Sequence, residues 1–103
     1  MMINDLFKKA NELKNKINSI NEELEKETIE SIVGGDMIKI SANGKGDIKS
    51  INIDDSLLNV DKKDILQGLL ISCIQSIQEK VKNKTEEKMR QFPIDIPGFP
   101  FVK

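Results

Sequence analysis

The sequence predicts an α+β fold with a long N-terminal helix, a three-stranded antiparallel sheet and a long C-terminal helix. Three patterns lead to this expectation. A helical apolar repeat occupies residues 3–25, a period-two alternation flanks a glycine-marked turn within residues 36–54, and a second helical pattern runs to about residue 91. One face of the predicted sheet is apolar and must be covered, and we expect the two helices to cover it.

The N-terminal helix is predicted from a heptad repeat. Apolar residues recur alternately three and four positions apart from Ile3 to Leu24, and most other positions hold Asn, Lys or Glu, with Phe7 the one large exception. At about 1.5 Å per residue, a helix from Ile3 to Glu25 is roughly 33 Å long. Because the apolar stripe is narrow, we expect another helix as its packing partner.

The three strands are predicted from alternation and turn residues. A β-branched segment, Glu27–Val33, reads as the first strand, and Gly34-Gly35 follows it as a turn. Isoleucines then alternate with polar residues on both sides of Asn43-Gly44, which is a strong hairpin signal and fits a type I′ turn. Gly46 indicates a bulge or a slightly longer loop.

The C-terminal helix is expected to begin at Asp61, acting as N-cap, and to end near Gln91. Leu57 and Leu58, in the connection before it, are expected to be buried. The helix is apolar almost all round up to Ile77 and charged beyond that point, so its first half should be buried. We expect residues 1–92 to form a single domain and residues 93–103, which are rich in proline and apolar residues, to form a C-terminal tail.

The composition argues against catalysis and metal binding. The 103 residues include no histidine, which removes the commonest general base and the commonest metal ligand. No glycine-rich phosphate loop leads from a strand into a helix, and the acidic residues near the start of the C-terminal helix are explained by capping without a metal. We therefore expect a protein that is not an enzyme, with no cofactor, no metal and no small-molecule substrate.

The single cysteine and the N-terminus bear on location. Cys73 lies in an apolar run, where we expect it to fill the core, and one cysteine rules out an intramolecular disulfide. We expect no signal peptide, and no apolar run in the sequence approaches the roughly 20 residues that span a bilayer. We expect a cytoplasmic protein without a membrane partner.

Positive charge gathers in two segments although the formal net charge is −1. Residues 1–21 hold four lysines and two acidic residues, and residues 80–91 hold five basic and two acidic residues, whereas residues 22–79 carry six lysines against twelve acidic residues. If the two helices pair antiparallel through their apolar stripes, both basic segments lie side by side at the end far from the sheet. Patch placement matters more for nucleic-acid binding than total charge.

Several short motifs in a fixed order resemble one known family. They are Gly34-Gly35, the hairpin signal around Asn43-Gly44, the run Ile51-Asn52-Ile53-Asp54 with Leu57-Leu58 after it, and Pro97-Gly98-Phe99. Along nearly its whole length the chain resembles the YbaB/EbfC family of bacterial nucleoid-associated proteins. Asp55 departs from the pattern, because the family usually has proline there. The resemblance implies a tweezer-shaped homodimer that binds double-stranded DNA with little sequence preference and serves bacterial chromosome organisation in the nucleoid.

The family offers no DNA-contact motif to carry over, so we predict the contacting residues from charge. Lysines on flexible stems neutralise phosphates without reading base edges, and a single arginine gives little support to base-specific recognition. The predicted DNA-binding residues lie on the two helical arms: Lys8, Lys9, Lys14, Lys16, Lys80, Lys82, Lys84, Lys88 and Arg90.

Two other interpretations stay open at this stage. Lysine, glutamate and asparagine on exposed helix faces are also the composition of an ordinary solvated surface. A helix, hairpins and a second helix are in addition the layout of prefoldin-like chaperone subunits, whose helical arms grip other proteins. A heptad seam open at its far end, with Met89, Phe92 and the apolar tail, would suit such a protein-binding or scaffold module without DNA binding.

Overall fold

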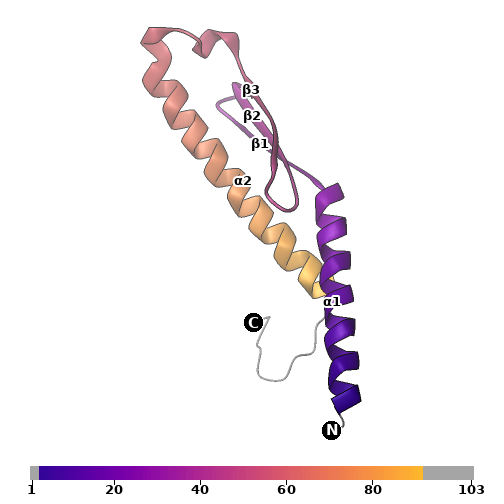
Figure 1. Cartoon of the computed structure of the whole chain (residues 1–103). Helices are drawn as coiled ribbons and strands as arrows, with labels where there is room; N and C mark the ends of the chain where they lie inside the picture. Colours follow the sequence, from indigo (N-terminus) through magenta and orange to yellow (C-terminus); the bar gives the residue numbers. More distant parts are fainter. Residues whose placement is uncertain (1–2, 92–103) are drawn as a thin grey trace.

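The computed structural model describes residues 3–91, and the predicted tail lies outside them. Figure 1 shows an elongated molecule in which α2 runs alongside a small sheet and its C-terminal end meets α1, which continues beyond it. Its extents are 68 × 24 × 18 Å. The order is α1 (Ile3–Lys26), β1 (Thr28–Val33), β2 (Ile38–Asn43), β3 (Ile48–Ile53), two short 3-10 turns and α2 (Lys63–Gln91). The predicted fold class is confirmed.

The three strands form one antiparallel sheet in the order β1-β2-β3. The core lies between this sheet and α2, and Ile38 and Ile40 on β2 are fully buried against Cys73 and Ile77 on α2. Alternation in β2 produces this arrangement, because successive side chains of a strand point to opposite faces. The expected burial of Cys73 is confirmed, and its thiol donates to the Ser31 carbonyl oxygen at 3.2 Å.

The turn after β2 differs from the predicted type I′ turn. Neither Asn43 nor Gly44 has a positive φ, whereas Gly46 has φ +94°. The side chain of Asn43 organises a longer loop, because its Oδ1 accepts from the backbone N–H groups of Lys45 at 2.9 Å and Asp47 at 3.1 Å. Asparagine favours such local bonds. Gly44 is needed for a close approach, since its N–H donates to the Leu24 carbonyl oxygen of α1 at 2.7 Å.

A register shift in β3 gathers its isoleucines on one face. Ile51 pairs with Ile40 and Ile48 pairs with Ala42, so Lys49 is the extra residue of a bulge. Without the bulge, Ile48 and Ile51 would point to opposite faces, because they are an odd number of positions apart. The bulge or longer loop expected at Gly46 is followed by this bulge at Lys49.

The connection from β3 to α2 corrects two predictions. Asn59, not Asp61, is the capping residue, and its Oδ1 accepts from the Lys62 N–H at 3.1 Å at the start of the second 3-10 turn, Val60–Lys62. Leu57 in the first turn, Asp55–Leu57, is buried as expected, but Leu58 is 61% exposed. Both Asn and Asp are good capping residues, so composition alone did not separate the two positions.

The heptad stripe of α1 is covered only at its C-terminal end. Ile20 and Leu24 are buried, whereas Ile3 and Leu6 are exposed. Within the described residues, the expected packing of another helix along the stripe is seen only at the last turns of α1, where α2 contacts it. The reason is the length and direction of α2, which ends about midway along α1 (Figure 1).

Candidate nucleic-acid interface

The two basic segments do not lie side by side at the end far from the sheet. The last turns of α2 contact the C-terminal part of α1, and Lys88 Nζ lies 3.1 Å from Glu23 Oε1. About two turns nearer the N-terminus of α2, Lys80 Nζ donates to the Glu30 carbonyl oxygen of β1 at 2.7 Å. The end of α2 meets α1 near the middle of α1 (Figure 1). The first half of α1 therefore extends past the end of α2, and its lysines lie away from those of α2.

Lys84 and Lys88 form a cluster of ion pairs that joins α2 to Glu23 of α1 and to Glu27, the residue between α1 and β1. Lys88 Nζ also lies 3.2 Å from Glu27 Oε2, and Lys84 Nζ lies 3.7 Å from Glu27 Oε1 and 3.4 Å from Glu87 Oε1. Lys88 is only 9% exposed. Its hydrogen bonds to Glu23 and Glu27 raise the pKa of Lys88, and the hydrogen bond and charge of Lys88 lower the pKa of Glu27.

The spacing of residues along α2 indicates that Lys84 and Lys88 face the protein, which counting charges did not reveal. Cys73, Ile77, Val81, Lys84 and Lys88 follow one another at spacings of four, four, three and four, so they share one face of α2. The first two are buried in the core, and the two lysines continue the same face onto α1. Phase relative to the core therefore distinguishes lysines that face the protein from lysines that face solvent.

The other predicted DNA-binding residues are exposed. On α1 these are Lys8, Lys9, Lys14 and Lys16, and on α2 they are Lys80, Lys82 and Arg90. Their side chains therefore lie at the surface of the molecule. The structure places the α1 lysines on the half of the helix that extends beyond α2, which we call the α1 arm (Ile3–Lys16).

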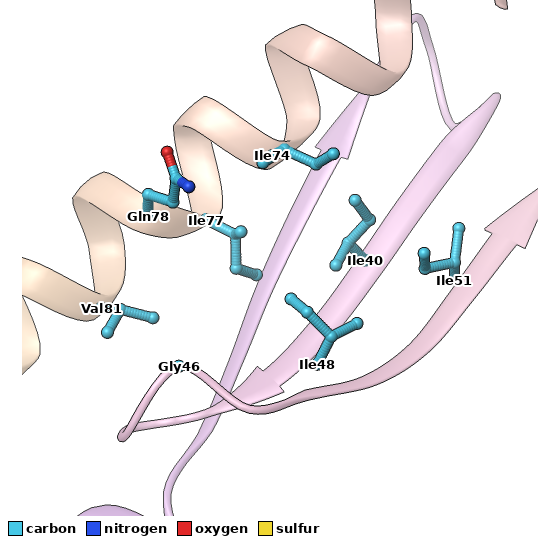
Figure 2. Close-up of a pocket in the computed structure, with 8 residues that line it drawn as sticks. All are labelled: Ile40, Gly46, Ile48, Ile51, Ile74, Ile77, Gln78 and Val81. Atoms are coloured by element: carbon cyan, nitrogen blue, oxygen red, sulfur yellow. The ribbon is translucent and has the colours of Figure 1, made fainter.

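A separate apolar groove lies between β3 and α2 (Figure 2). It has a volume of about 300 Å³ and is lined mainly by aliphatic side chains: Ile40, Ile48, Ile51, Ile74, Ile77 and Val81, with Gly46 and Gln78. Ile48, Ile51 and Ile74 are 49, 50 and 40% exposed. Since α2 lies over β1 and β2, β3 is left as an open edge with an apolar face.

Comparison with known proteins identifies the family. The sequence profile of the YbaB/EbfC DNA-binding family matches residues 1–94. The chain belongs to the YbaB/EbfC DNA-binding family. A nucleoid-associated protein of Persephonella marina is 42% identical over 85 residues, covering 80% of this chain and 77% of that protein. A nucleoid-associated protein of Dictyoglomus thermophilum is 34% identical over 93 residues, covering 90% of this chain and 89% of that protein.

A solved structure has a similar fold. The crystal structure of the uncharacterized protein HP0035 from Helicobacter pylori has a TM-score of 0.81 and 25% identity, and the match covers 88% of this chain and 96% of that one. The predicted family resemblance is confirmed, and so is the expectation of a nucleoid-associated, DNA-binding family that is not enzymatic.

The described part of the chain contains neither a cluster of metal ligands nor a membrane-spanning helix. Within residues 3–91, no three or more His, Cys, Asp or Glu residues are grouped so that they could hold a metal ion. No helix within the same range is long and apolar enough to cross a bilayer.

Proposed function

We propose that this YbaB/EbfC protein binds double-stranded DNA as a homodimer in the bacterial nucleoid, with phosphate contacts from its helical arms and little sequence preference. The observation that carries the proposal is the α1 arm, a helix segment that projects beyond α2 and bears exposed lysines. Lysine supplies a point charge on a flexible stem, which suits phosphate neutralisation and not base readout. A cytoplasmic location follows from binding the chromosome.

The contacts described above refine the nine residues predicted from charge. Lys84 and Lys88 are engaged with carboxylates of Glu23, Glu27 and Glu87, so we assign them to holding α2 against α1. Bringing either ammonium to a phosphate would leave a carboxylate without its partner. The DNA-facing residues in this proposal are the exposed ones: Lys8, Lys9, Lys14, Lys16, Lys80, Lys82 and Arg90. Lys80 also donates to the Glu30 carbonyl oxygen, which uses one of the three donors of its ammonium group.

DNA retention by two lysine variants with equal charge loss tests this assignment. The arm variant combines Lys8→Gln, Lys9→Gln and Lys14→Gln. The control combines Lys49→Gln, Lys62→Gln and Lys63→Gln, which are exposed lysines outside the α1 arm and outside the nine residues predicted to bind DNA. We expect the arm variant to lose most DNA retention in a gel shift and the control to keep it. Equal losses in the two variants would mean that only total charge matters, and an unaffected arm variant would reject the arm as the binding surface.

The homodimer is supported by the groove between β3 and α2. A chain of 103 residues buries a modest share of its surface, and an open strand edge with an apolar face is a liability unless another surface covers it. A second copy that covers Ile48, Ile51 and Ile74 would bury this apolar face and place two α1 arms in one assembly.

Sedimentation of two neighbouring β3 variants tests the dimer. Ile51→Glu puts a charge into the groove, whereas Ser50→Glu puts the same charge on the other face of the strand. We expect a dimer for the parent chain and for Ser50→Glu, and a monomer for Ile51→Glu. A dimer that persists in Ile51→Glu would place the interface elsewhere.

The prefoldin-like alternative predicts client binding by the arms without DNA retention. The relatives that match this chain are nucleoid-associated proteins, so the DNA-binding proposal has the stronger support. Charge reversal of Lys84 or Lys88 is a poor test between the two, because it breaks the ion pairs between the helices. The arm variant above separates them without that defect.

A further inference from the structure

The exposed part of the α1 stripe is an apolar surface that needs an occupant. Ile3, Leu6 and Ile17 on the stripe are 70, 61 and 42% exposed, and Phe7 beside it is 67% exposed, whereas Ile20, farther along the same stripe, is 4% exposed. Burying side chains of this size away from water lowers the free energy of the protein. The stripe is therefore half covered by the described residues, and the uncovered half begins where α2 stops.

The C-terminal end of α2 points towards this surface. Lys88 is held at Glu23 of α1, and α2 ends at Gln91, about one turn farther on. Since the two helices run in opposite senses, the end of α2 lies near the covered part of the stripe and its axis runs towards the Ile3 end of α1 (Figure 1).

The residues after α2 are long enough to cover the exposed stripe. Twelve residues, 92–103, follow α2. Extended at about 3.1 Å per residue they span roughly 37 Å, whereas α1 from Ile20 back to Ile3 measures roughly 26 Å at about 1.5 Å per residue. The segment is therefore long enough to follow the whole stripe without a turn.

The chemistry of the two surfaces also matches. Residues 92–103 contain three of the four phenylalanines of the chain, two isoleucines and a valine, with Asp95 and Lys103 as the only charged side chains. Three prolines restrict the unbound conformations, which lowers the entropy lost on docking in an extended form.

We propose that residues 92–103 dock along the exposed α1 stripe of the same chain and complete the packing that Ile20 and Leu24 begin. The stripe then has an occupant of its own, distinct from the groove between β3 and α2. Lys8 lies on the face of α1 opposite the stripe, so a docked segment leaves it open to solvent.

Fluorescence of a single introduced tryptophan tests the docking, because the chain has no tryptophan or tyrosine. In a Phe99→Trp background, we compare Leu6→Ser with Leu13→Ser against a control with Asn4→Ser and Asn11→Ser, two positions before each leucine on the opposite helix face. We expect the parent emission to be blue-shifted relative to a peptide of residues 92–103 carrying the same tryptophan. The leucine variant should shift to the peptide value, and the asparagine control should not shift.

Emission equal to that of the peptide, or unchanged by the leucine substitutions, would overturn the proposal. Far-UV circular dichroism checks that both variants stay folded, which we expect because Leu6 is exposed and neither leucine belongs to the core.

A disulfide test decides whether the occupant comes from the same chain. About six extended residues after Phe92 bring Gly98 near Ala10, so a chain carrying Ala10→Cys and Gly98→Cys should form an internal disulfide on mild oxidation. In an equal mixture of the two single variants we expect little linkage between chains. Linkage only between chains would assign the stripe to a second copy, and no linkage at all would argue against docking; both outcomes reject the proposal. Neither readout involves DNA, so the result is independent of the proposed function.

Discussion

Gly44 offers the sharpest test of how α1 is attached to the sheet. A Cβ atom at this position would lie 2.7 Å from the Leu24 carbonyl oxygen, 2.9 Å from Leu24 Cδ2 and 3.1 Å from Leu24 Cα. Two of these atoms are backbone, so the clash is relieved only if the loop or the helix end moves. Such a movement also weakens the hydrogen bond from the Gly44 N–H to the Leu24 carbonyl oxygen.

The expected cost of Gly44→Ala follows from these distances. Overpacking costs about 1–3 kcal/mol, and a weakened hydrogen bond costs about 1 kcal/mol. The lower entropy of the unfolded alanine chain offsets about 0.5–1 kcal/mol. We therefore expect Gly44→Ala to lower the free energy of unfolding by about 2 kcal/mol, with the clash as the dominant contribution.

Gly68 provides the matched control for the same substitution. It lies inside α2, and a Cβ there would meet nothing within 4 Å. Alanine is better than glycine in a helix interior by about 1 kcal/mol, so we expect Gly68→Ala to raise the free energy of unfolding by that amount. Urea denaturation followed by circular dichroism, at one fixed protein concentration, measures both variants. Equal shifts in the two variants, or a Gly44→Ala protein as stable as the parent, would refute the proposed close approach of the loop to α1.

The remaining predictions concern titration and thiol chemistry. Lys88 lowers the pKa of Glu27, so the contribution of this ion pair to stability is present above the unfolded pKa of the carboxyl and is lost as the pH falls through the folded pKa. Glu27→Gln should therefore reduce the loss of stability at acid pH, measured by denaturation at a series of pH values. The pKa of Lys88 is raised by Glu23 and Glu27, so its contribution is present below the unfolded lysine value and is lost as the pH rises through the folded value; Lys88→Met should remove this alkaline loss. The Cys73 thiol is fully buried and donates to the Ser31 carbonyl oxygen, so a thiol reagent should modify it only after unfolding, and rapid reaction in the native protein would contradict the packing.

Local patterns predicted most of the fold. The heptad repeat predicted α1 to within a residue, β-branched residues predicted β1, and alternation predicted β2 and β3, because side-chain period follows directly from backbone geometry. The predicted start of α2, with Asp61 as cap, lies within two residues of the observed start at Lys63, but the capping side chain is that of Asn59, which caps the 3-10 turn before α2. The turn at Gly44 was misjudged because its glycine serves a close approach to α1, which is distant in sequence.

The arm geometry could not be derived from local patterns, because it depends on where two helices cross. Charge counting placed Lys84 and Lys88 with the solvent-facing lysines, whereas the crossing turns them towards Glu23 and Glu27. Their phase with Cys73 and Ile77 was readable from the sequence and predicts the inward face correctly. The acidic partners, Glu23 on α1 and Glu27 just after it, could not be identified from the sequence, since their distance from Lys88 depends on the angle between the helices.

The salt dependence of DNA binding tests the central proposal most directly. If four to six cations of the assembly reach phosphates, the logarithm of the binding constant should fall against the logarithm of salt concentration with a slope of roughly −4 to −5. The variant without Lys8, Lys9 and Lys14 should show a shallower slope, by about 0.9 for each phosphate that is no longer neutralised. A slope near zero for the parent protein, or an unchanged slope for the arm variant, would contradict phosphate binding by the α1 arm.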